Sequence, residues 1–110
     1  MPATHIIKND QGLPSITQTK PGSGIYRSGF WVLAKTTAEA LKGGKIYFHE
    51  RQSDPSFHGG IIMEAEKLEE GEQAGRVVFT FKFDPACRGI TTSREGWSQE
   101  MKIILHDKSQ

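Results

Sequence analysis

The sequence is poor in cysteine and has no long hydrophobic run. Its 110 residues include one cysteine, Cys87, which excludes an internal disulfide and the usual multi-cysteine zinc site. No apolar stretch reaches the roughly 18 residues that a membrane-spanning helix needs. The first residues also lack the basic and then apolar pattern of a secretory signal. We therefore expect a cytoplasmic protein, short enough for a single domain.

Repeats, low-complexity tracts and a large net charge are also missing. The formal net charge is +1, but the charges are unevenly distributed. Five glutamates gather in residues 64–72 beside one base, so basic residues outnumber acidic ones elsewhere. This distribution predicts a basic face opposite an acidic hairpin. An ordinary surface of mixed, solvated charges explains the same counts equally well.

Short apolar segments with a two-residue period predict β-strands at 30–34, 45–50, 60–68, 76–83 and 101–105. The third and fourth strands are joined by a polar turn and should form a hairpin. The residues expected to share one face of their strand are Ile61, Met63 and Ala65; Val77, Phe79, Phe81 and Phe83; and Met101, Ile103 and Leu105. Residues 86–100 are expected to form a loop.

One short helix is predicted at residues 36–42. Thr36 and Glu39 have the spacing of a capping box, and Lys42 lies where a cation favours the helix end. Gly43 is suited to the left-handed cap. Residues 1–24 are rich in proline and glycine, so they predict a flexible arm, with an edge strand at 4–8 and then a loop. Residues 25–110 are expected to form the domain.

Together these elements predict a mainly β fold with one or two short helices. We expect a small antiparallel β-barrel, because a short sheet hides its edges by curling. Such a fold holds its loops on a rigid frame, where binding residues concentrate.

Four segments resemble the PUA-like superfamily, in particular its EVE and ASCH domains. They are an aromatic first strand at 28–33, the helix at 36–42, a glycine-led strand at 44–49 and the glycine-rich start of the next strand at 59–62. The resemblance covers residues 29–83, about half of the chain, and rests on pattern. Gly43 and Lys45, followed by Glu50 and Arg51, are similar to the ASCH motif at a wider spacing. The resemblance implies a small barrel that binds RNA or modified nucleobases in a cleft beside the 45–50 strand.

The polar loop at 49–60 is the main candidate for ligand contacts, although a simple connector would also explain its proline and glycines. Arg51 offers a planar fork of donors for a phosphate or a base edge. Tyr47 and Phe57 can stack on a base. The candidate ligand-binding residues are Arg27, Trp31, Tyr47, His49, Arg51, Gln52, Ser56, Phe57, Arg88 and Trp97.

The two tryptophans have alternative interpretations. Trp31 is either a core residue or a wall on which a base stacks. Trp97 lies in a polar loop, where it is either a lid over the barrel mouth or part of an aromatic pocket. Arg88 and Arg94 flank it and can supply charge to a phosphate backbone. Cys87 is expected to be structural.

These observations favour a binding module for nucleic acid or a modified nucleobase, working as a monomer or homodimer. One alternative is a protein-interaction domain that uses the acidic hairpin or an exposed row of phenylalanines. Another is a small hydrolase with His49 or His58 as a general base, oriented by Glu50 or Asp54. No nucleophile–base motif supports catalysis, and the two histidines lack a third metal ligand, so we expect no catalytic residue, metal or cofactor.

Overall fold

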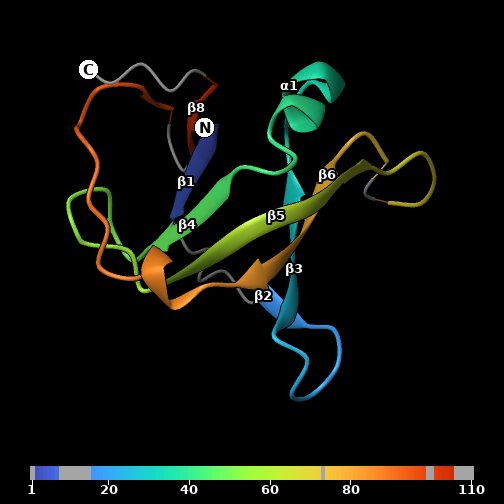
Figure 1. Ribbon diagram of the computed structural model, residues 1–110. Coiled ribbons are helices and arrows are strands. Elements are labelled where there is room, and N and C mark those ends of the chain that lie inside the picture. The colour runs from blue at the N-terminus through green and yellow to red at the C-terminus, as the bar shows by residue number, and fades with distance from the viewer. Residues whose placement is uncertain (1, 8–15, 73, 99–100, 106–110) are drawn as a thin grey trace.

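The computed structural model describes residues 2–7, 16–72, 74–98 and 101–105. Its strands are β1 (Ala3–Ile7), β2 (Ile16–Gln18), β3 (Ile25–Trp31), β4 (Lys45–His49), β5 (His58–Lys67), β6 (Val77–Phe83), β7 (Trp97–Ser98) and β8 (Met101–Ile104). Its helices are α1 (Lys35–Ala40) and the 3₁₀ turn η1 (Pro85–Cys87). The protein is therefore mainly β, as predicted (Figure 1). No helix in the described ranges has the length and apolar character to span a bilayer.

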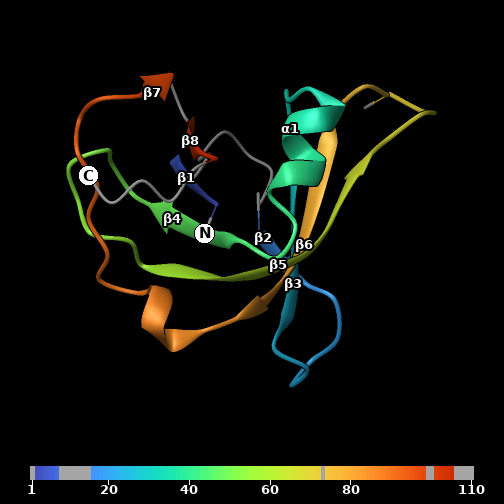
Figure 2. The same cartoon turned by 45° about the horizontal axis from the view of Figure 1, so that its top comes forward.

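The strands form one sheet in the order β2-β3-β6-β5-β4-β1-β8-β7. The prediction of a purely antiparallel sheet is wrong, because β1 pairs with β4 in parallel. The sheet curls around α1 (Figure 2), yet β2 and β7 remain its two end strands, so the described strands do not close a barrel. The core fills the inner face of the curl, with Ile6, Ile46, Phe48, Ile62, Phe79 and Phe81 almost fully buried.

The N-terminal segment is more integral to the sheet than its sequence predicts. Instead of an edge strand on a flexible arm, β1 lies between β4 and β8, and Ile6 is fully buried. The alternation of apolar residues predicts a strand at this point. It does not reveal the neighbours of that strand, because β4 and β8 lie more than 35 residues away in the sequence. Part of the predicted loop forms β2, whereas residues 8–15 lie outside the described ranges.

The predicted hairpin is confirmed as β5 and β6. Val77, Phe79 and Phe81 are fully buried as expected, whereas Phe83, the last residue of the predicted row, is half-buried. On β5 the predicted inward set is wrong, because a register shift between Ile62 and Glu64 reverses the alternation. Ile62 and Ala65 are buried instead, and Met63 is 47% exposed.

The predicted strand at 30–34 and the helix cap also differ from the structure. β3 begins and ends earlier, and Val32 lies 73% exposed beyond it. α1 begins at Lys35 after Ala34, with no side-chain cap, so the Thr36 capping box is wrong. Packing of Ala38 and Leu41 into the core holds the helix without that cap. Gly43 does adopt a positive φ of 82° after the helix.

Candidate functional site

The outer face of the sheet, opposite the core, carries a row of basic side chains. Cross-strand register places Ile25, Lys82, Ile61 and Lys45 side by side on β3, β6, β5 and β4. Arg27 lies on the same face of β3, opposite Thr80. Arg27 and Lys82 are exposed, and Lys45 is half-buried. We call Arg27, Lys45 and Lys82 the basic band.

The side chains of the basic band form no close pairs with acids in the described part of the chain. Among the described residues, none of its three side chains takes part in an ion pair. Glu64, which shares the register row of Arg27 and Thr80, pairs instead with Lys42 at 3.5 Å. Asp84 accepts a hydrogen bond from the Ala86 amide. The band therefore combines net positive charge with the half-buried apolar surface of the two isoleucines.

A second outer-face cluster lies where β1, β4 and β8 meet. His49 is fully buried, and its Nδ1 lies 2.8 Å from the Asp54 main-chain oxygen. Because a carbonyl only accepts, Nδ1 must carry the proton. In neutral His49 the Nε2 atom then accepts from Nδ1–H of His5, 2.9 Å away. Both His49 nitrogens are thereby used inside the fold, which gives His49 a structural role and leaves it no polar atom for the predicted ligand contact.

Lys102 of β8 lies beside His5 and is only 7% exposed. Its Nζ donates to Thr92 Oγ1 at 2.8 Å, to the Ser93 main-chain oxygen at 2.9 Å and to Ser93 Oγ at 3.0 Å. All three ammonium protons thus anchor the loop that follows η1. Burial, His49 and Lys102 together lower the pKa of His5 to about 4. His5 and Lys102 were not among the predicted site residues.

Tyr47 and Trp97 complete this cluster. The Tyr47 ring stacks on His5 at 4.6 Å between centroids, and its pKa is raised mainly by burial and then by Cys87 and Asp84. Trp97 packs edge-on against His49 at 5.8 Å, and its buried Nε1 has no hydrogen-bond partner among the described residues. Trp97 therefore belongs to an aromatic cluster and is not a lid. Tyr47 stays half-buried and accessible.

Ser56 joins the loop after β4 to the loop after η1. Its Oγ donates to the Cys87 oxygen at 2.5 Å and accepts from the Ile90 amide at 3.0 Å. Ser56 is 4% exposed and its hydroxyl is used inside the fold, which does not favour the predicted ligand contact. Cys87 is fully buried, and burial raises its pKa, so its thiol is structural as predicted.

Replacing Ser56 by alanine should destabilise the fold by about 1–3 kcal/mol, because it leaves the buried Cys87 carbonyl and the half-buried Ile90 amide without this partner. Urea unfolding followed by circular dichroism measures this cost. Ser53→Ala, at an exposed turn position, is the matched control and should change stability by less than about 0.5 kcal/mol. Equal stability of the Ser56 variant and the wild type would show that these two hydrogen bonds do not stabilise the fold.

Four further predicted residues lie elsewhere. Trp31 is 3% exposed within the core, and its Nε1–H donates to Ser28 Oγ at 3.1 Å, so it is no stacking wall. Phe57 packs against the core. Arg51 is exposed and pairs with Asp54 at 3.1 Å, and Gln52 follows it in the same exposed turn.

The remaining candidate, Arg88, lies at an aromatic rim on the inner face. Its guanidinium carbon is 5.0 Å from the Phe83 ring centroid. The same ring lies 5.2 Å from His58, which also contacts Tyr26 at 4.8 Å. Burial and then Arg88 lower the pKa of His58. The sequence did not predict Tyr26 or Phe83 as site residues, because Phe83 fits the apolar row of its predicted strand and Tyr26 lies outside every predicted strand.

The surroundings of His49 and His58 bear on the hydrolase alternative. Within the described ranges, neither His49 nor His58 hydrogen-bonds to a carboxylate, and the Asp54 carboxylate pairs with Arg51. The same part of the chain holds no group of three or more histidine, cysteine, aspartate or glutamate residues placed to bind a metal. In the described part of the chain, neither histidine is therefore seen to be oriented by a carboxylate as a general base would be.

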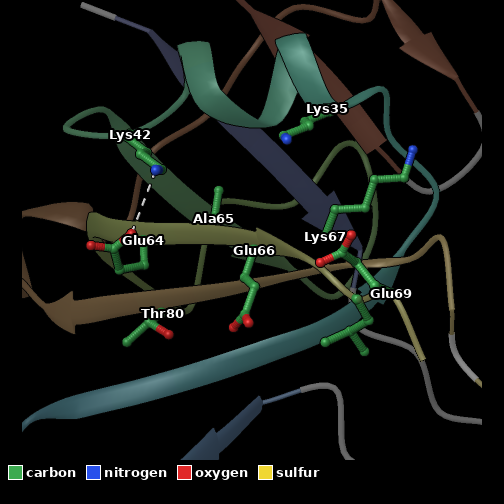
Figure 3. Close-up of a pocket in the computed structure, with 9 residues that line it drawn as sticks. Lys35, Lys42, Glu64, Ala65, Glu66, Lys67, Glu69 and Thr80 are labelled. Atoms are coloured by element: carbon green, nitrogen blue, oxygen red, sulfur yellow. Dashed lines mark ion pairs between the residues drawn. The ribbon is translucent and has the colours of Figure 1, made fainter. Parts of the chain in front are cut away.

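A separate hollow lies between α1 and the second half of β5 (Figure 3). Lysines and glutamates line it in equal number: Lys35, Lys42, Lys67, Glu64, Glu66 and Glu69. The Lys42–Glu64 pair spans one side of it. This balance of charge favours no ligand of one sign.

No protein-family model matches the chain, and neither the curated proteins nor the solved structures compared with it include a match.

Proposed function

We propose that this protein binds nucleic acid on the outer face of its sheet, with the phosphate backbone held by the basic band. The observation that carries the proposal is that three cations, none of them ion-paired with any described residue, share one sheet face with the half-buried Tyr47. Phosphate contacts by lysine and arginine supply most of the affinity in binding that does not depend on sequence. The ligand class agrees with the one that the PUA-like resemblance implies.

The distribution of acidic residues also favours binding of nucleic acid at the basic band. The acidic residues of 64–72 extend along the β5–β6 hairpin, away from η1 (Figure 1). They repel phosphate at that end of the sheet. Tyr47 lies on the same face of β4 as Lys45 and offers a ring for a base at the end of the band.

The test is fluorescence anisotropy of a labelled 12-nucleotide RNA and of DNA with the same sequence. Three phosphate contacts on a single strand predict a slope of about −2 in log K against log salt, or roughly 20-fold weaker binding at 200 mM than at 50 mM salt. The triple variant Arg27→Gln, Lys45→Gln and Lys82→Gln should bind weakly and lose most of this slope.

The matched control is Lys35→Gln, Lys67→Gln and Arg76→Gln, which removes the same charge from α1 and the hairpin. It should keep the wild-type slope, because these positions lie outside the basic band. If neither RNA nor DNA binds at 50 mM salt, or if both triple variants behave alike, the proposal is wrong.

A further inference from the structure

The aromatic rim brings together side chains from three strands and one loop. Tyr26 of β3, His58 of β5 and Phe83 of β6 are half-buried, and Tyr26 and His58 pack on the fully buried Phe81. His58 lies at the centre, 4.8 Å from Tyr26, 5.6 Å from Phe81 and 5.2 Å from Phe83. We call Tyr26, His58, Phe83 and Arg88 the rim cluster.

The rim cluster has polar groups that its own packing does not use. Neither His58 nitrogen has a hydrogen-bond partner among the described residues. The Arg88 guanidinium lies over the Phe83 ring, and the side chain is exposed. A core cluster would bury its rings on every side and pair its polar atoms. Here, planar groups and free hydrogen-bonding atoms reach the surface together.

The rim cluster also adjoins the basic band in the chain. Lys82 directly precedes Phe83, and Ile25, which pairs with Lys82, directly precedes Tyr26. Successive residues of a strand point to opposite faces. The rings therefore lie on the inner face, just across the strands from the cations that hold phosphate in the proposed function.

We infer that the rim cluster holds one unpaired base, which makes single-stranded nucleic acid the ligand of this protein. The inference rests on the proposed function. A base inserts between the Phe83 ring and the exposed Arg88 guanidinium, which moves outward from its place over the ring, while His58 hydrogen-bonds to the edge of the base. Bases inside a duplex are covered by their stacked neighbours and cannot offer a ring face, so a duplex uses the basic band alone.

The experiment compares a single-stranded 12-nucleotide RNA with a duplex of the same sequence at 100 mM salt. Phe83→Leu removes the ring, and Phe83→Tyr keeps it. The leucine variant should bind the single strand roughly tenfold more weakly, which is the loss of one stacked base, and should bind the duplex as before. The tyrosine variant should bind the single strand within about twofold of the wild type.

A second variant, Arg88→Lys, keeps the positive charge but removes the planar guanidinium group. It should weaken single-strand binding severalfold at an unchanged salt slope. A strand carrying 2-aminopurine gives an independent readout, because fluorescence of that base falls when it stacks on a protein ring. Thermal unfolding of each variant shows whether the fold is intact.

The outcomes separate the two proposals. Absence of any binding overturns the proposed function and the inference together. Salt-dependent binding that is equal for single strand and duplex, with no effect of Phe83→Leu, overturns the inference and leaves the basic band intact. If Phe83→Leu unfolds, Arg88→Lys and the 2-aminopurine signal still decide the question.

Discussion

Replacing Gly60 by alanine is expected to prevent β5 from fitting between β4 and β6. A Cβ at this position would overlap the main-chain oxygen of Lys82 and lie 2.6 Å from its carbonyl carbon. Main-chain atoms of a paired strand cannot move away without breaking the ladder. We expect a loss of about 4 kcal/mol or more, which is most of the stability of a small domain. Circular dichroism and urea unfolding measure it.

Gly71→Ala is the matched control. Gly71 has a φ of 88°, but its Cβ would meet nothing within 4 Å. The cost is then the backbone strain alone, about 1–2 kcal/mol. The Gly71 variant should remain folded at 25 °C. A Gly60→Ala protein that unfolds within 1 kcal/mol of the wild type would show that the β5–β6 register differs from the one described.

Acidification between pH 6.5 and 4 should destabilise the protein by about 3 kcal/mol through His5. The pKa of folded His5 is about 4, against 6.5 for an unperturbed histidine. In this window the unfolded chain binds more protons than the folded chain, so stability falls as the pH falls. The lowered pKa of His58 acts in the same direction.

His5→Asn tests the source of this effect. Its amide nitrogen can replace Nδ1 as the donor to His49, but it does not titrate. Urea unfolding at pH 7.5, 6, 5 and 4 should show a much shallower fall in stability for this variant than for the wild type. Parallel curves for the two proteins would place the pH dependence elsewhere.

Some of the predicted site residues are buried and others are exposed, because burial depends on partners that are distant in sequence. His49 and Ser56 lie in a polar segment, which is why the sequence predicts ligand contacts for them. Their hydrogen bonds instead go to His5, Cys87 and Ile90. Lys102 lies between apolar residues and would ordinarily be exposed, but a loop ten residues earlier supplies three acceptors. Local pattern contains no signal for such pairings.

The local pattern of the sequence was enough to determine the β class, the β5–β6 hairpin and the inward row of Val77, Phe79 and Phe81. These features follow from two-residue alternation and turn chemistry, which act between near neighbours. Tertiary structure alone decided the place of β1, the register shift in β5, and the assembly of the basic band and the rim cluster. Those depend on which strands pair and on which face each side chain lies, and a shift of one residue reverses that face.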